Sequence, residues 1–325
     1  MTTRRSLLAA SVGTGAAAVL AACGGGGPTV RSAWTYTDDT GFTAHVDHTP
    51  KRIAGLTDAV SSLWAYGIEP VAVFGYTAMK DDSSFDGRDL SSVKEVGRTY
   101  GEIDIEALAA ARPDLIVTHV YPKNGGTKLT GTETLYGFAD KTQVDKVREI
   151  APVVAITMAG RADAVIRRTN DLAVRLGVPP ARLDRYRKRF EAAGARLTKA
   201  AKRGLTVMAE AAYADKGLYI AKAPDDPSLS YYRHLGVDFP DPGGSAYYWQ
   251  TATWEQVSKH SVDVVLNSTR AMSIPDLLKQ PTFAALPAAR AHQVFPWNFQ
   301  TQDYVSQARN LNDLASWLEK STKVT

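Results

Sequence analysis

Short apolar runs alternate along this chain with segments of helical periodicity. The runs are rich in β-branched residues, which is typical of buried strands in a parallel sheet. They occur at Arg52–Leu56, Val71–Phe74, Leu115–Val117, Pro152–Ile156, Thr206–Ala209, Val264–Leu266 and Gln293–Phe295. A helical pattern covers residues 162–203 and is interrupted at Gly177-Val178-Pro179-Pro180. Its second half has one apolar stripe, formed by Leu183, Tyr186, Phe190, Ala193, Leu197 and Ala200. The alternation predicts an α/β protein.

One helix–strand pattern occurs twice, at a constant offset of 149 residues. Residues 104–117 align without a gap to residues 253–266, and each copy opens with a residue that favours a helix N-terminus. The matched pairs are Asp104 with Thr253, Glu106 with Glu255, and Asp114 with Asp263. We interpret the repeat as two related lobes that differ by insertions. A coincidental match of a common helix–strand pattern is the alternative.

The predicted fold is therefore α/β, with two Rossmann-like lobes, each with a mostly parallel sheet. A long α-helix bridges the lobes, and a ligand cleft lies between them. The predicted divisions are 1–22, a signal peptide; 23–50, a linker and N-terminal strand region; 51–160, the first lobe; 161–203, the interlobe helix region; and 204–325, the second lobe. A helix between lobes is stiff, so we expect only a small closure on ligand.

The N-terminal segment has the pattern of an export signal. A basic start with Arg4-Arg5 precedes 17 small and apolar residues, Ser6–Ala22, which is short for a membrane span. The sequence Leu20-Ala21-Ala22-Cys23 resembles the lipobox of bacterial lipoproteins, which implies lipid on Cys23. We expect an extracytoplasmic protein anchored to the cell membrane, exported by the twin-arginine or the general secretory route.

Composition excludes several other classes. The 38 basic and 34 acidic residues give a net charge of +4, and removal of the signal takes away two arginines, leaving 36 − 34 = +2. This balance gives little support to nucleic-acid binding. A single cysteine excludes a disulfide framework and a cysteine-based metal cage. The six histidines are dispersed, with one close pair at His45 and His48, which disfavours a direct metal carrier. The 14 tyrosines leave a bare-iron carrier open.

No catalytic motif stands out in the sequence. There is no Gly-x-Ser-x-Gly turn, no phosphate-binding loop and no dinucleotide fingerprint after a strand. We therefore expect a protein that is not an enzyme. An exported α/β enzyme is the alternative from a different class.

Several short motifs, in a fixed order, carry a resemblance to a known family. They are Lys51-Arg52-Ile53, Tyr66–Val73, Glu95-Val96-Gly97-Arg98, Arg112–Val117, Ile150–Val154 and Thr253–Val257. In these the chain resembles the substrate-binding proteins of bacterial ABC importers of the ferric-siderophore and vitamin B12 class. The resemblance implies a monomer that binds an iron(III)–siderophore complex and delivers it to an ABC permease dimer with its ATPase. It implies no nucleic-acid partner, no membrane contact beyond the lipid anchor, and no cofactor beyond the lipid on Cys23.

The resemblance also gives a role to the repeated glutamates. Glu106 and Glu255 match the acidic residues, one in each lobe, that dock onto arginines of the permease. Equivalent carboxylates on two related lobes suit a partner with two-fold symmetry. A simpler alternative is that each acid stabilises the start of its own helix.

The ligand site is expected beyond the carboxyl ends of the strands. Aromatic residues there suit a large, partly apolar solute, and a guanidinium suits anionic oxygen donors. The candidates are Tyr76, Arg98, His119, Tyr121, Tyr213, Tyr247, Tyr248, Trp249, Arg270 and Trp297. The resemblance to hydroxamate binders assigns the main roles to Arg98, Tyr121 and Trp249. Few basic candidates are present, which favours a hydroxamate or mixed-donor chelate. Haem, cobalamin or another solute remains open.

Overall fold

A computed structural model describes residues 33–123, 128–298 and 301–325, and Ala33–Thr325 forms one compact unit. The predicted signal peptide and Cys23 lie outside the described residues. In the described part of the chain, no helix is both long and apolar enough to span a membrane.

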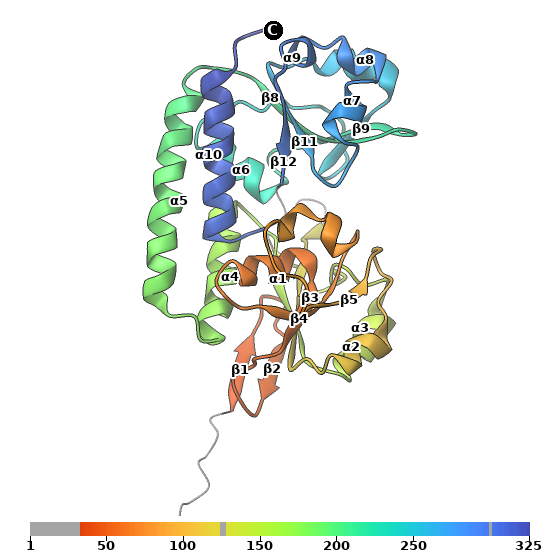
Figure 1. The fold of residues 1–325 in the computed structure, drawn as a ribbon, viewed down its shortest axis with the longest axis vertical. Helices are drawn as coiled ribbons and strands as arrows, with labels where there is room; N and C mark the ends of the chain where they lie inside the picture. Colours follow the sequence, from red (N-terminus) through yellow and green to blue (C-terminus); the bar gives the residue numbers. More distant parts are fainter. Residues whose placement is uncertain (1–32, 124–127, 299–300) are drawn as a thin grey trace, which may run out of the picture. The chain divides into compact units, whose positions relative to one another are not determined.

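The first lobe is built on a five-stranded sheet in the order β5-β4-β3-β6-β7, with every neighbouring pair parallel (Figure 1). Its strands are β3 Ile53–Leu56, β4 Pro70–Phe74, β5 Lys94–Gly97, β6 Leu115–Val120 and β7 Val153–Thr157. Its helices are α1 Thr57–Trp64, η1 Met79–Asp81, η2 Ser83–Phe85, α2 Ile105–Ala110 and α3 Lys141–Arg148. A hairpin of β1 Trp34–Thr37 and β2 Thr43–Val46 precedes them. The predicted α/β class is confirmed.

The second lobe has a mixed five-stranded sheet in the order β10-β9-β8-β11-β12. β8 Val207–Tyr213, β11 Val264–Ser268 and β12 Val294–Trp297 are parallel. β9 Gly217–Ala221 and β10 Trp249–Ala252 are antiparallel and carry polar or aromatic residues that the apolar-run pattern missed. The helices of this lobe are α6 Pro227–His234, η4 Trp254–His260, α7 Ile274–Leu277, α8 Pro281–Ala284 and α9 Pro287–Arg290.

Two long helices run side by side, and one of them extends along both lobes (Figure 1). The helical region expected at 162–203 consists of α4 Ala162–Arg175 and α5 Pro180–Ala201, separated at the predicted Gly-Pro interruption. The predicted stripe of α5 is buried, with Tyr186 half-buried. The C-terminal helix α10 Tyr304–Lys320 packs along α5, and Arg196 on α5 lies 2.6 Å from Glu319 on α10. The predicted long helix between the lobes is thus α5, and α10 packs against it.

The repeat seen in the sequence corresponds to an equivalent contact in the two lobes. Asp114 precedes β6 and accepts a hydrogen bond of 2.7 Å from the Arg52 N–H at the start of β3. Asp263 precedes β11 and accepts one of 2.9 Å from the Thr206 N–H at the start of β8. Each aspartate therefore ties a central strand to its neighbour. The helices of the repeat differ, because residues 254–260 form a 3₁₀ helix where a short α-helix was expected.

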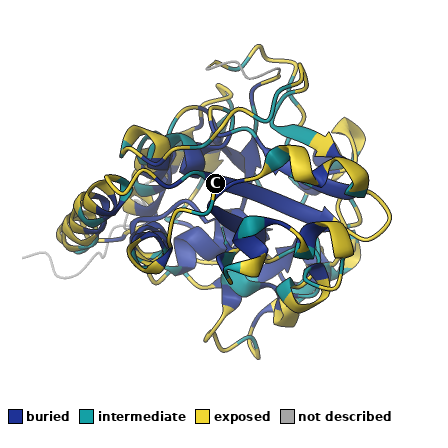
Figure 2. Ribbon diagram, turned by 90° about the horizontal axis from the view of Figure 1, so that it is seen from above, coloured by how far each residue is buried: buried dark blue, intermediate teal, exposed yellow. Residues whose placement is uncertain are grey.

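The sheets form the core of both lobes, and the exposed residues lie on the surrounding helices and loops (Figure 2). One acid is buried among them. Glu210 on β8 is fully buried, and neither carboxyl oxygen has a hydrogen-bond partner among the described residues. Burial raises the pKa of Glu210 well above its usual value. The folded protein therefore favours the protonated form of this side chain.

Replacing Glu210 with glutamine should remove a pH-dependent loss of stability. Above the ordinary pKa of a glutamate, the unfolded chain releases a proton that the folded chain retains. The free energy of unfolding therefore falls with rising pH, by about 1.4 kcal/mol per pH unit, until the folded pKa is reached. Urea unfolding between pH 4.5 and 7.5 should give a shallower pH dependence for Glu210→Gln than for wild type. Parallel curves for the two proteins would contradict the assignment, and Glu149→Gln, at an exposed position, is the control.

Candidate functional site

The carboxyl ends of the parallel strands of both lobes point toward the junction between the lobes. From the first lobe, β3 leads into Asp58, β4 into Tyr76, and β6 into Tyr121. From the second lobe, β11 leads into Arg270. Gly55 lets β3 approach β6 closely, because a Cβ there would lie 2.0 Å from the Val117 carbonyl oxygen. These strand ends are where the sequence analysis expects the ligand site.

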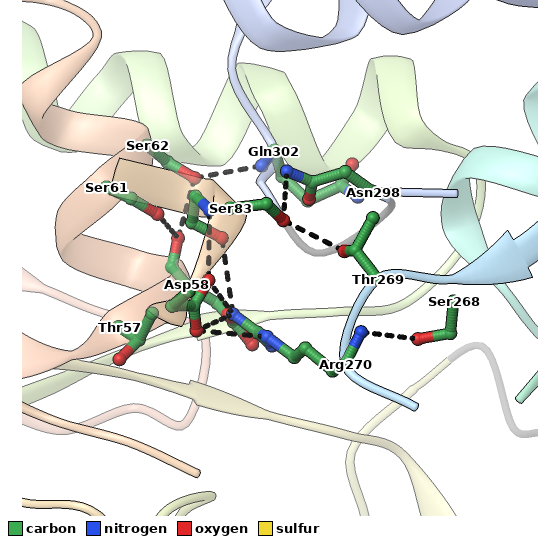
Figure 3. A network of polar contacts seen from close by, with 12 residues as sticks. Thr57, Asp58, Ser61, Ser62, Ser83, Ser268, Thr269, Arg270, Asn298 and Gln302 are labelled. Atoms are coloured by element: carbon green, nitrogen blue, oxygen red, sulfur yellow. Dashed lines mark hydrogen bonds and ion pairs between the residues drawn. The ribbon is translucent and has the colours of Figure 1, made fainter. Parts of the chain in front are cut away.

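A buried ion cluster joins the lobes (Figure 3). Arg270 from the second lobe lies 2.5 Å from Asp58 and 2.9 Å from Asp82, both in the first lobe. The Arg270 side chain is 14% exposed and the two carboxylates are 1% exposed. Burial opposes the charge of Arg270, but the two carboxylates outweigh it and raise its pKa above the usual value. We call Asp58, Asp82 and Arg270 the interlobe ion cluster.

Neutral hydrogen bonds surround the ion cluster (Figure 3). The hydroxyl of Ser83 lies 2.8 Å from that of Thr269 and accepts a hydrogen bond of 3.1 Å from the Asn298 amide. The backbone N–H of Gln302 donates to the Ser62 hydroxyl at 2.8 Å. The lobes therefore contact each other directly in this conformation.

Four tyrosines form the first lobe's side of the junction. The ring centroids of Tyr76 and Tyr136 lie 6.0 Å apart, and those of Tyr121 and Tyr136 lie 4.8 Å apart. Tyr100 is 5.2 Å from Tyr136 and is 43% exposed. The guanidinium of Arg270 lies 5.0 Å from the Tyr76 ring centroid, a cation–π distance. The rings give this wall a broad aromatic surface.

The second lobe supplies three consecutive aromatic residues. Tyr248 lies 4.8 Å from Trp249 and 6.0 Å from Tyr247, measured between ring centroids. Tyr248 has a φ of 67°, an uncommon conformation for a tyrosine. Its hydroxyl donates to Asp226 at 2.6 Å and its N–H donates to Asp225 at 3.1 Å. These two contacts hold the strained residue in place.

The aromatic residues of the two lobes come close to each other. Burial raises the pKa of Tyr248 well above its usual value. Asp226 of the same lobe and Tyr121 of the opposite lobe raise it further. Burial also raises the pKa of Asp226 to about 6, although the Tyr248 hydroxyl partly opposes the shift. We call Tyr76, Tyr100, Tyr121, Tyr136, Tyr247, Tyr248 and Trp249 the aromatic cluster.

Other predicted site residues lie farther out. Arg98 follows β5, is 72% exposed at its side chain, and lies 2.5 Å from Glu95. Tyr213 is 41% exposed in the β8–β9 hairpin and connects to Trp249 only through Tyr219, with ring centroids 5.4 and 6.4 Å apart. Trp297 is buried at the end of β12 and borders a cavity of about 250 Å³ beside α10, which Ser83, Thr269 and Asn298 also line. The junction therefore brings together only part of the predicted set.

Arg270 has a different environment from the one expected of a ligand-binding arginine. Its Nε and Nη2 contact two carboxylates, and Nη2 also contacts Ser84 at 3.2 Å, so these two nitrogens are already engaged in this structure. The sequence analysis also missed Asp58, Asp82, Tyr100, Tyr136 and Tyr219. Asp58 lies two residues beyond β3 and could have been found by applying the strand-end rule to that strand. Tyr136 could not, because it enters from a loop outside the strand ends.

Glu106 and Glu255 occupy equivalent places in the two lobes. Each is exposed and lies one residue inside a short helix, α2 or η4, that leads into the fourth strand of its sheet. Asp104 caps its helix by accepting the Ala107 N–H at 2.8 Å. In the described residues neither glutamate forms an ion pair with Lys, Arg or His. Both carboxylates therefore face solvent.

The described residues contain no group of three or more His, Cys, Asp or Glu arranged to hold a metal ion. In the close pair at His45 and His48, His48 lies 2.5 Å from Asp47 and 3.1 Å from Asp114. His119 is fully buried beside Tyr121, with ring centroids 6.4 Å apart. Burial, aided by the charge of Arg270, lowers the pKa of His119 to about 3, so the imidazole is neutral.

Comparisons with known proteins agree with this architecture. A family model described as periplasmic binding protein matches residues 53–301. The structure of DesE, a ferric-siderophore receptor protein from Streptomyces coelicolor, is similar with a TM-score of 0.79 and 28% identity, covering 90% of this chain and 100% of that one. No curated protein matches the sequence.

Two more distant structures share the fold. The siderophore periplasmic binding protein from the fuscachelin gene cluster of Thermobifida fusca has a TM-score of 0.60 and 23% identity, covering 83% of this chain and 96% of its own. The FhuD protein from S. pseudintermedius has a TM-score of 0.61 and 19% identity, covering 89% and 99%.

Proposed function

The chain belongs to the periplasmic binding protein family, and from this premise we propose that it is an extracytoplasmic receptor for a ferric siderophore. Family membership gives it a solute-binding role and a location outside the cytoplasm. The observation that carries the choice of ligand is the similarity to DesE, a ferric-siderophore receptor protein, over the whole of that chain. The iron is cargo held by the siderophore and is not a cofactor of the protein.

The junction between the lobes supports a ligand that is large and partly apolar. Its two walls carry the aromatic cluster, which can cover the organic backbone of a chelate while phenol hydroxyls orient it. Tyr121 and Trp249, the residues expected in hydroxamate binders, lie on opposite walls. Few cations are available for a highly anionic chelate, because Arg270 is engaged by two carboxylates. We therefore favour a hydroxamate or mixed-donor siderophore.

Arg98 is proposed to reach the ligand from the loop after β5. Its side chain is 72% exposed and, among the described residues, pairs with Glu95, and an ion pair of so exposed an arginine costs little to exchange. A guanidinium so placed can turn toward the oxygen donors of a chelate. Tyr76, Tyr247 and Tyr248 are proposed to line the same cleft. We place Tyr213, Trp297 and Arg270 outside direct contact with the ligand.

Delivery to a transporter and attachment to the membrane complete the proposal. Glu106 and Glu255 are proposed to dock on a two-fold ABC permease, and lipid on Cys23 to keep the monomeric receptor near it. The solvent-facing carboxylates at equivalent places in the two lobes support the docking role. The domain divisions at residues 51–160, 161–203 and 204–325 also remain proposals.

Ligand titration tests the binding function. The chain from residue 33 should show saturable quenching of tryptophan fluorescence, with a submicromolar dissociation constant, on addition of a ferric tris-hydroxamate. Trp249 in the cleft provides the signal. Arg98→Ala should weaken binding about tenfold or more, which corresponds to about 1.4 kcal/mol. Its fold should be unchanged, because the lost ion pair is exposed.

The control ligands are a ferric catecholate, haem and cobalamin. The control variant is Arg187→Ala, which removes an exposed arginine on α5 that is not at a strand end. Arg187→Ala should bind as wild type. If no iron chelate changes the tryptophan fluorescence, the proposed function is refuted. Saturable binding of haem or cobalamin alone would assign the same cleft to a different solute.

A further inference from the structure

The interlobe ion cluster carries more negative than positive charge. Asp58 and Asp82 are two carboxylates, and Arg270 is the one Lys, Arg or His within ion-pair distance of them in the described residues. His119 lies nearby but is neutral, because its pKa is lowered to about 3. The cluster therefore has a formal surplus of one negative charge at the junction of the lobes, in surroundings where charge is weakly screened by water.

The surplus charge is not shared equally by the two aspartates. Asp82 is fully engaged: Oδ1 accepts the Ser84 N–H at 2.9 Å, and both oxygens accept from Arg270. Asp58 gives only Oδ1 to Arg270. Its Oδ2 is buried and has no hydrogen-bond partner among the described residues. A buried carboxylate oxygen without a donor is costly, so the position calls for a hydrogen-bond donor, preferably a charged one.

Asp58 lies close to the tyrosines of the first lobe. Asp58 contacts Arg270, whose guanidinium lies over the Tyr76 ring at 5.0 Å, and Tyr76 packs with Tyr136. The charge of Asp58 also contributes to the raised pKa of Tyr121, after burial and Tyr136. The carboxylate thus lies among the phenols of the first lobe's wall (Figure 3 shows its contact with Arg270). These are the rings proposed above to cover a chelate.

We propose that Asp58 forms a subsite for a cationic amine on the bound chelate, with Oδ2 accepting from an ammonium group. This inference rests on the proposed function and names the charge class of its ligand. An ammonium on Oδ2 makes two cations for two carboxylates, so the cluster becomes neutral. It also satisfies the one carboxylate oxygen of the cluster that Arg270 leaves without a donor. The lobes meet over this position, so the amine enters when they part and is enclosed when they close.

A matched pair of chelates tests the subsite on the unaltered protein. Ferrioxamine B carries a pendant ammonium beside its tris-hydroxamate iron core, and its N-acetylated form keeps the core but is neutral. The chain from residue 33, which is one compact unit, should bind ferrioxamine B at least tenfold more tightly than the N-acetylated form. Fluorescence titration measures both constants. Because this comparison needs no variant, it stands even if a substitution disturbs folding.

Two variants test whether the preference for ferrioxamine B arises at Asp58. Asp58→Asn should reduce the ratio of the two affinities to about one, by weakening ferrioxamine B and leaving the N-acetylated form within about threefold. Asp82→Asn removes the same charge but leaves the Asp58 oxygen available, so it should keep most of the preference. Thermal unfolding of each variant checks that it is folded.

The outcomes separate the subsite from the proposed function. Equal binding of the two chelates by wild type overturns the subsite and leaves the ferric-siderophore function standing. Equal loss of the preference in both variants also overturns it, because the cluster's total charge would then account for the effect. If neither chelate binds, the ferric-hydroxamate function fails and the subsite fails with it.

Discussion

Replacing Arg270 with methionine should lower the free energy of unfolding by about 3–5 kcal/mol. The substitution leaves Asp58 and Asp82 buried without a counter-charge, and both side chains are only 1% exposed. Removing one partner of a buried ion pair costs more than the pair itself contributes, because the remaining charge stays desolvated. Guanidinium unfolding followed by circular dichroism measures the loss in the chain from residue 33.

Two further variants separate this explanation from a loss of packing. Arg270→Met combined with Asp58→Asn and Asp82→Asn removes all three charges, and it should recover most of the lost stability. Arg187→Ala removes an arginine that pairs with Asp184 and Glu191 at exposed positions, so it should cost less than about 1 kcal/mol. If the triple variant is as unstable as the single one, the buried charges are not the cause.

Replacing Glu106 and Glu255 together with glutamine should reduce siderophore uptake more than tenfold while ligand affinity stays unchanged. Each carboxylate faces solvent, so the isolated receptor loses no interlobe or core contact. A charge pair that becomes desolvated in a complex contributes about 2–5 kcal/mol, and two lost pairs exceed the roughly 1.4 kcal/mol that corresponds to tenfold. Uptake of radioactive iron by cells that carry the variant, beside fluorescence titration of the purified protein, measures both quantities.

The control for this prediction is Glu149→Gln, which removes an exposed carboxylate of the first lobe outside the repeat. Its uptake should equal that of wild type. Each single variant, Glu106→Gln or Glu255→Gln, should show a smaller defect than the pair, because the other lobe still docks. A loss of ligand affinity in the double variant would refute the docking role. Normal uptake would also refute docking and would favour the simpler role, in which each glutamate stabilises the start of its own helix.

One physical rule predicts the region of the candidate site from the sequence: ligands lie beyond the carboxyl ends of parallel strands. The rule places Tyr76, Tyr121 and Arg270 at the junction, and the structure has them there. It did not reveal Tyr136, which enters from a loop before α3 and packs 4.8 Å from Tyr121. Loop residues have no periodicity that fixes their position, so their partners emerge only from the fold. The role expected for Arg270 changed for the same reason, because its carboxylate partners lie about 190 and 210 residues away in the chain.

By itself, the sequence determined the α/β class, the helix–strand repeat, the helical region at 162–203 and most of the parallel strands. These follow from local periodicity, since a buried strand needs a short apolar run and a packed helix needs one apolar stripe. Strand β10 was not predicted, because the polar Gln250 and Thr251 interrupt any such run, and the short apolar run of β9, Gly217–Ala221, was overlooked. Only the tertiary structure decided which side chains meet across the lobes. Asp58, Asp82 and Arg270 form one buried cluster because folding brings the strand ends of both lobes together. Its unequal charge, and the oxygen of Asp58 left without a donor, depend on that contact and on no pattern along the chain.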